Sequence, residues 1–141
     1  GIAGGMPILS GRALGMGYID IIGIILALAV LFWIPTHILT FSMRYREDYA
    51  AAGIPTFPST YGDSTTRIVI AIASVAATLL IGSAAIMIGV EQGLLHFLGI
   101  FSGGLMVMAI LMLIRPSAKM NFHLFKFASV YMLAAMILLA I

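Results

Sequence analysis

The chain has 141 residues, of which 62% are hydrophobic and only 9% are charged. Such an apolar composition excludes an ordinary water-soluble domain and is typical of a chain that lies in a bilayer. The formal net charge of +2 is too small to indicate a nucleic-acid partner, and the absence of cysteine excludes disulfides, thiolate metal sites and a cysteine nucleophile.

Long apolar runs separated by short polar segments indicate the architecture. Each run is about 20 residues long, the length that a helix needs to cross roughly 30 Å of hydrocarbon. Because the runs are continuously apolar, they lack the period-two alternation of a membrane β-barrel. The expected fold class is all-α, a polytopic transmembrane helical bundle with about four full spans and the end of a fifth helix.

The first 17 residues are rich in glycine and contain Pro7, which predicts the end of one helix and a connection. The chain starts at Gly1, and no basic segment precedes the first hydrophobic run, so no signal peptide is predicted. We expect these residues to continue from an earlier part of a longer membrane protein. Full spans are expected at residues 18–43, 66–90, 94–114 and 122–141.

Two polar segments connect the expected spans on one side of the membrane. They are residues 44–65 and residues 115–121, and six of the seven Lys and Arg residues lie in or close to them. Because two spans separate the segments, both face the same side, and the positive-inside rule predicts that this side is cytoplasmic. The expected location is the cell membrane, with a multi-pass topology.

Two pairs of small residues are spaced for close contact between helices. Ala73 and Ala77 lie on one expected span, and Gly99 and Gly103 lie on the next. Small residues at this spacing let two helix backbones approach closely within a membrane. Both pairs are therefore expected at helix–helix contacts.

The densest group of ionisable residues follows the first full span. Residues three and four apart share one face of a helix, so a continuous helix would align a stripe from mid-membrane to the polar mouth. That stripe contains Trp33, His37, Thr40, Arg44 and Asp48. Ionisable groups at membrane depth usually face a bundle interior or a wet cavity, which makes His37 and an Arg44–Asp48 pair candidate site residues. The alternatives are a membrane anchor with a helical salt bridge and a structural core histidine.

Charged residues near the end of the stripe suit a magnesium-bound diphosphate. Magnesium prefers carboxylate, water and phosphate oxygens, and arginine can bind phosphate through two parallel hydrogen bonds. The relevant residues are Arg44, Arg46, Glu47 and Asp48. A single carboxylate cluster provides few protein ligands for magnesium, and Asp63 is the only other carboxylate nearby in the sequence.

The same region carries a family resemblance. The run FWIPTHILTFSMRYREDYAAAGIPTFP resembles the second signature segment of the UbiA-type intramembrane prenyltransferases, most closely in their haem O synthase branch (protoheme IX farnesyltransferases). The matching positions are Trp33, Pro35, His37, Arg46, Asp48, Tyr49, Ala52, Gly53, Ile54, Pro55 and Pro58. Supportive flanking matches are Pro7 and Gly11 upstream, and Phe125, Lys126, Phe127 and Tyr131 near the end.

Three positions bear on which branch of the family is resembled. Most other branches have a DxxxD motif whose first Asp falls at Arg44, and this difference favours the haem branch. Thr36 and Ile38 depart from the haem-branch pattern, which normally has Pro and an aromatic residue there. The resemblance therefore indicates the superfamily and leaves the acceptor open.

The resemblance implies both a fold and a reaction. The chain would be the C-terminal part of a nine-helix UbiA-type fold, whose first acidic motif would lie in an N-terminal half absent from this chain. The implied enzyme is a Mg²⁺-dependent polyprenyl transferase that moves farnesyl from farnesyl diphosphate to haem B, giving haem O. Alone, the chain would hold half an active site and be inactive.

The resemblance also implies roles for the charged residues. Asp48 and Glu47 would help to hold Mg²⁺. Arg44 and Arg46 would neutralise the charge of the diphosphate. His37 would contact the haem or a propionate, or orient its neighbours.

Four further residues would bind substrate. The rings of Trp33, Tyr45 and Tyr49 would line the path of an allylic cation. Lys126 would meet a haem propionate or serve as an interfacial anchor. Two alternatives remain: a UbiA-type transferase with a quinone or lipid acceptor, and a non-enzymatic membrane subunit or small transporter.

Overall fold

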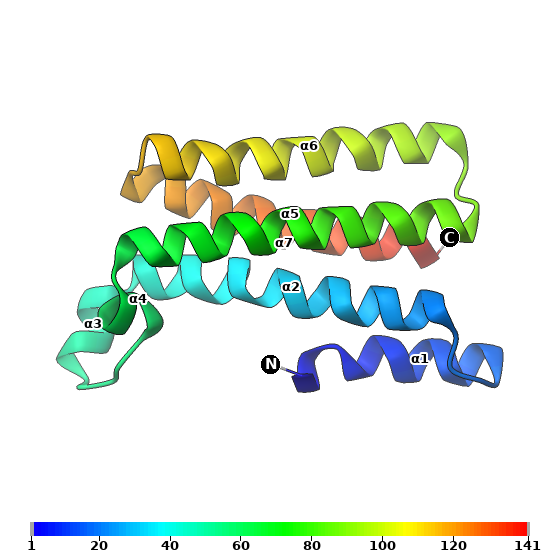
Figure 1. The fold of residues 1–141 in the computed structure, drawn as a ribbon, viewed down its shortest axis with the longest axis horizontal. Coiled ribbons are helices and arrows are strands. Elements are labelled where there is room, and N and C mark those ends of the chain that lie inside the picture. Colours follow the sequence, from blue (N-terminus) through cyan, green and yellow to red (C-terminus); the bar gives the residue numbers. More distant parts are fainter. Residues whose placement is uncertain (1, 141) are drawn as a thin grey trace.

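The structure is a computed structural model that describes residues 2–140. Four long helices run side by side in alternating directions, and each contacts at least two of the others, so that they form a closed four-helix bundle (Figure 1). They are α2 (Ile21–Arg44), α5 (Asp63–Ile88), α6 (Gln92–Ile114) and α7 (Ala118–Ala140). No strand occurs in the described range, and the predicted all-α bundle with about four full spans is confirmed.

All four long helices have the length and composition of membrane spans. The shortest have 23 residues, which at 1.5 Å per residue reach about 35 Å and exceed the hydrocarbon core. α7 begins at Ala118 rather than at residue 122, because the Ser117 hydroxyl accepts the backbone N–H of Met120 at 3.1 Å and caps the first turn. Residues 1 and 141, which end the expected terminal segments, lie outside the described range.

Two short helices lie between α2 and α5, at the left of Figure 1. These are α3 (Arg46–Ala51) and α4 (Phe57–Tyr61). The connection between α6 and α7 lies at the same end of the bundle. We call this end, which carries six of the seven basic residues in or near its connections, the charged end.

The N-terminal segment forms a 3₁₀ turn (Ile2–Gly4) and α1 (Met6–Met16), where the end of a helix and a connection were expected. Pro7 stands in the first turn of α1, where its missing N–H leaves no hydrogen bond unmade, so it begins the helix rather than breaking it. α1 ends at Gly17, whose φ of 80° lies in the left-handed region that favours glycine. The segment then reverses, and α1 packs against the first part of α2 (Figure 1).

An ion pair joins α1 to the start of α2. The Arg12 guanidinium donates to both carboxylate oxygens of Asp20, with Nε at 2.8 and 2.9 Å and Nη2 at 2.7 Å. Asp20 also caps α2 by accepting the backbone N–H of Gly23 at 2.9 Å. These hydrogen bonds, those from Arg12 above all, hold the pKa of Asp20 below its ordinary value of 3.8.

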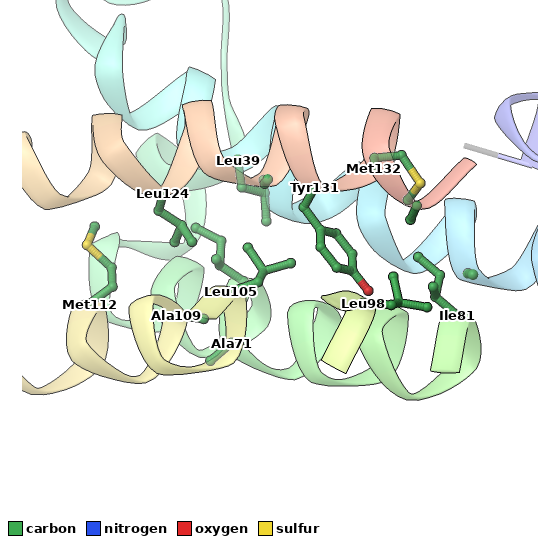
Figure 2. Close-up of a cluster of buried hydrophobic side chains, with 14 of the residues drawn as sticks. Leu39, Ala71, Ile81, Leu98, Leu105, Ala109, Met112, Leu124, Tyr131 and Met132 are labelled. Carbon is green, nitrogen blue, oxygen red and sulfur yellow. The ribbon is translucent and has the colours of Figure 1, made fainter. Parts of the chain in front are cut away.

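The core of the bundle lies between α5, α6 and α7 and extends to α2 (Figure 2). Tyr131 is its largest fully buried side chain, and its hydroxyl pairs with the Ser102 hydroxyl of α6 at 2.9 Å, so the one polar atom of the ring is not left without a partner. Other labelled core residues are Leu39, Ala71, Ile81, Leu98, Leu105, Ala109, Met112, Leu124 and Met132.

The contact between α2 and α5 uses small side chains and hydroxyl groups. Ala73 and Ala77 are buried, as their spacing predicted. The hydroxyls of Thr36 and Ser74 hydrogen-bond across the two helices at 2.9 Å. Such a bond lets two buried polar groups satisfy each other inside an apolar bundle.

The prediction for the other small pair is wrong for the described chain. A Cβ added at Gly99 or Gly103 would meet no heavy atom within 4 Å, so neither glycine permits a close helix contact here. The adjacent Gly104 does so instead, because a Cβ there would lie 3.0 Å from the Phe127 ring of α7. The face of α6 that contacts α7 is therefore rotated from the one that the spacing indicated.

Candidate functional site

The expected stripe from Trp33 to Asp48 is interrupted at Tyr45. α2 ends at Arg44, and Tyr45 leaves helical geometry with φ −106° and ψ 30° before α3 begins at Arg46. Asp48 therefore does not continue the face of α2 that carries His37. Among the described residues, Arg44 and Asp48 form no ion pair; the Arg44 guanidinium lies over the Phe122 ring instead, 4.9 Å from its centroid.

Thr40 also leaves the stripe. It is fully buried, and its hydroxyl donates to the backbone carbonyl of Thr36 at 2.6 Å. Its own carbonyl accepts the Asn121 amide of α7 at 2.8 Å. Thr40 is therefore part of the polar contacts that hold the bundle together, and it does not line a substrate surface.

Trp33 and His37 form part of a row of rings in stacked or tilted contact, which we call the aromatic row. On α2 the row contains Trp33, His37, Phe41 and Tyr45, and on α7 it contains Phe122 and Phe125. Successive centroids lie 4.8 Å apart for Trp33 and His37 and 4.6 Å apart for Phe41 and Tyr45. Phe125 stacks on His37 at 4.7 Å and approaches Phe41 at 5.8 Å, so it joins the two halves of the row.

Hydrogen bonds to α7 fix the deeper half of the aromatic row. The Trp33 indole N–H donates to the backbone carbonyl of Ala128 at 2.9 Å. His37 Nδ1 lies 3.1 Å from the Ser129 hydroxyl, whose proton is directed to the Phe125 carbonyl at 2.9 Å. His37 is therefore held against α7 through Ser129.

Two cations stand at the end of the aromatic row nearest the charged end. Lys126 Nζ lies 4.6 Å from the centroid of Phe122, the same ring that Arg44 approaches. Neither cation forms an ion pair with a carboxylate in the part of the chain that the structure describes. The row thus combines flat apolar rings with positive charge that is free to meet an anionic group.

Asp48 opens onto a separate shallow groove of about 320 Å³ on α3. Aromatic side chains form much of its wall: Phe41, Tyr45 and Tyr49. Asp48 and the neighbouring Glu47 are exposed, and neither forms an ion pair with another described residue. The groove therefore brings together Asp48, both candidate tyrosines and one end of the aromatic row.

Arg46 has a different environment from Asp48. It forms an ion pair with Asp63 at the start of α5, in which Nη1 lies 3.0 Å from Oδ2, and its Nη2 donates to the Pro58 carbonyl at 3.3 Å. Arg46 thereby ties α3 to α4 and α5. Asp63, the only other carboxylate that the sequence offered for a metal, is engaged in this pair.

The carboxylates present fit a partial magnesium site. Within residues 2–140, no group of three or more His, Asp or Glu side chains lies close enough to hold a metal ion. Asp48 and Glu47 provide two oxygen donors of the kind that magnesium prefers, and magnesium usually takes its remaining ligands from water and phosphate. Arg44 lies away from this pair, over Phe122.

Sequence reasoning missed Phe41 and Phe122 as members of this region. Phe41 stands four residues after His37 and four before Tyr45, so the helical spacing would have found it. Phe122 gave no such signal, because its role depends on how α7 packs against α2.

Comparisons with known proteins place the chain in one family. It matches the UbiA prenyltransferase family over residues 1–139. Over 131 residues it is 31% identical to a protoheme IX farnesyltransferase of Pyrobaculum islandicum, a match that covers 92% of this chain and 46% of that protein. Over 146 residues it is 31% identical to the protein of the same name in Teredinibacter turnerae, with 100% of this chain and 45% of the relative covered. No solved structure matches.

The chain spans just under half the length of these two relatives. Within that part, four helices are long and apolar enough to cross a bilayer, and the family consists of membrane proteins. The chain is thus a multi-pass membrane protein. It belongs to the UbiA prenyltransferase family.

Proposed function

We propose that the chain is the C-terminal half of an intramembrane transferase that moves farnesyl from farnesyl diphosphate to haem B, giving haem O. Family membership and the name of its relatives support the reaction class. The observation in the structure that carries the proposal is the placement of Asp48. This exposed carboxylate borders an aromatic-lined groove, beside one end of the aromatic row.

The groove beside Asp48 suits the departing diphosphate and the cation that it leaves. Asp48 and Glu47 would hold Mg²⁺, which when bound would neutralise the developing charge of the leaving group. The ring faces of Phe41, Tyr45 and Tyr49 would stabilise an allylic cation and keep water away from it. Arg44 is not assigned to the diphosphate in this proposal, because it does not line the groove beside Asp48.

The aromatic row suits the acceptor. Its stacked rings match the flat apolar face of a porphyrin, and Lys126 at its end would meet a propionate. Trp33 and His37 would line the deeper part of this surface, where both are hydrogen-bonded to α7. Arg46 would position α3 through its ion pair with Asp63 rather than contact substrate.

The proposal includes a partner and an orientation. An N-terminal half with the first acidic motif would complete the site, since Asp48 is the only carboxylate among the described residues that line the groove. Residues 44–65 and 115–121 would face the cytoplasm of a cell membrane, as the distribution of basic residues favours.

Haem O formation tests the proposal. Membranes that contain the chain together with its N-terminal half are incubated with haem B, farnesyl diphosphate and Mg²⁺, and the haems are separated by mass. We expect farnesylated haem that depends on both the diphosphate and the chain. Prenylated quinone precursors without farnesylated haem would instead support the quinone-acceptor alternative, and no prenyl transfer to any acceptor would refute the enzyme proposal.

A further inference from the structure

A second pocket opens at the charged end, inside the four-helix bundle rather than on α3. It has a volume of about 250 Å³ and lies where α2 and α6 end and α5 and α7 begin. Among its lining residues are Arg44, Arg67, Ser117 and Asn121. It has no lining residue in common with the groove beside Asp48, so the prenyl-transfer proposal leaves it without a role.

Asn121 gives the pocket one unused hydrogen-bond acceptor. The residue is only 3% exposed, and its amide nitrogen donates to the Thr40 carbonyl at 2.8 Å. This bond fixes the orientation of the amide and directs its oxygen away from Thr40. Oδ1 is buried and has no hydrogen-bond partner in the described chain. Because buried polar atoms are almost always paired, this oxygen calls for a donor from the pocket.

The rest of the pocket favours negative charge. Arg44 and Arg67 both line it, and neither forms an ion pair within the part of the chain that the structure describes. Asp63 also lines it, but its carboxylate is engaged with Arg46. Ser117 caps the first turn of α7 at the pocket wall, which adds the positive end of a 23-residue helix.

These features together specify the ligand chemistry. Water alone could donate to Asn121 but would leave the two arginines without a counter-ion. An anion without a proton to donate, such as sulfate, could meet the arginines but would leave Asn121 Oδ1 unpaired. A phosphate group that carries a hydroxyl satisfies both requirements.

We infer that this pocket binds a phosphate group bearing a hydrogen-bond donor, with its oxygens between Arg44 and Arg67 and its hydroxyl donating to Asn121. Two sources have this chemistry: a soluble phosphate with a P–OH group, and a lipid head group that has a hydroxyl beside its phosphate. The pocket lies at the ends of membrane-spanning helices, where both sources are within reach. The inference does not depend on prenyl transfer.

Binding to the purified full-length protein in phosphatidylcholine nanodiscs tests the soluble source. Inorganic phosphate at neutral pH is the probe, and sulfate is the matched anion without a donor. We expect phosphate to bind at least about fivefold more tightly than sulfate, since only phosphate can satisfy Asn121.

The lipid source is tested in the same nanodiscs by native mass spectrometry. Phosphatidylglycerol carries head-group hydroxyls, and phosphatidylmethanol has the same charge without them. We expect selective retention of phosphatidylglycerol if the head group is the occupant. Selectivity for the donor-bearing member of either pair supports the inference and identifies the source, whereas no selectivity in both pairs overturns it.

Matched arginine variants locate the site. Arg67→Gln removes a cation that lines the pocket, and Arg115→Gln removes one from the same end of the bundle that does not. We expect Arg67→Gln to weaken binding about tenfold and Arg115→Gln to change it less than twofold. Equal losses in the two variants would mean that binding follows overall charge, and this result would overturn the assignment. Circular dichroism of both variants checks that the helices are intact.

Discussion

Arg46 and Asp48 lie two residues apart but have different environments. Arg46 is bound to Asp63 and to the Pro58 carbonyl, so its guanidinium is largely committed to holding α3 in place. Asp48, two residues later, has no such partner among the described residues and borders the aromatic-lined groove. A carboxylate that is not neutralised by the protein is available to a metal ion or a substrate.

Replacing Asp48 tests this availability. If Asp48 holds Mg²⁺ against the diphosphate, Asp48→Asn should lower farnesyl transfer on the order of 100-fold, because the amide cannot supply the anionic oxygen. Glu91→Gln is the control, since it removes a carboxylate from the opposite end of the bundle. Transfer rates are measured in the complete enzyme. Unchanged transfer by the Asp48→Asn variant would remove this residue from the site.

A second prediction concerns Lys126. On the proposal that it meets a haem propionate, Lys126→Met should raise the KM for haem B roughly fivefold and leave the KM for farnesyl diphosphate unchanged. Lys119→Met is the matched control, because Lys119 lies on the same helix but not over Phe122. Steady-state kinetics with each substrate varied in turn distinguish the two effects. A similar change in both KM values would indicate a general structural role.

At the scale of elements, much of the fold could be predicted from the sequence, and the main error has a physical cause. Apolar runs of spanning length predict α2, α5, α6 and α7, because hydropathy over such a length identifies membrane-spanning helices. The break at Tyr45 gives no local signal: the surrounding charged residues are compatible with a helix, and no Gly or Pro intervenes. The pair between Arg46 and Asp63, 17 residues apart, joins the first residue of α3 to the first residue of α5, a contact that the local sequence does not reveal.

The site was predicted unevenly for the same reason. His37 could be selected from the sequence because ionisable residues at membrane depth are rare, and Asp48 because it lies in the densest group of charged residues. The unpaired Asn121 oxygen could not be predicted, since it depends on where the first turn of α7 meets Thr40. Features that depend on a single segment could be predicted from the sequence, whereas contacts between two helices could not.

The ion pair between α1 and α2 predicts a dependence on pH. The pKa of Asp20 is lower in the folded protein than its ordinary 3.8, so the stabilisation is present at neutral pH and is lost as the pH falls through the folded-state pKa. We expect the α1–α2 distance distribution to be narrow at neutral pH and to broaden below that pKa. Two spin labels measure it, on cysteines introduced at the exposed Leu14 and Ile24, and the natural chain has no competing cysteine.

Asp20→Asn should broaden this distribution at neutral pH, because Asn retains the helix cap but not the charge. Glu91→Gln is the control and should leave it unchanged; Glu91 precedes α6 and Asp20 precedes α2, and both helices start at the same end of the bundle (Figure 1). An unaltered distribution in Asp20→Asn would show that packing alone holds α1.

For the molecule as a whole, the spacing between helices is set by which small residues face inward. Ala77 is fully buried, whereas an added Cβ at Gly103 would meet nothing within 4 Å. Gly103 therefore has room for a larger side chain and Ala77 does not, although both were expected at helix contacts.

Unfolding measurements in detergent micelles test this difference. Ala77→Leu should destabilise the bundle by about 1–3 kcal/mol, because the larger side chain does not fit a fully buried position without displacing its neighbours. Gly103→Ala should be neutral or stabilise by up to about 1 kcal/mol through its higher helix propensity. Substantial destabilisation by Gly103→Ala would mean that this face of α6 makes a contact beyond the described chain.

The ion pair of Arg46 with Asp63 anchors the segment between α2 and α5 at two points. The chain is anchored at the first residue of α3 and again at Asp63, and displacement between two anchors is smallest next to them. Asp48 stands close to the first anchor, whereas residues 52–56 are farther from both. Under the proposed function, residues 52–56 would be displaced as substrate enters or leaves, while the Asp48 carboxylate beside the first anchor would keep its position.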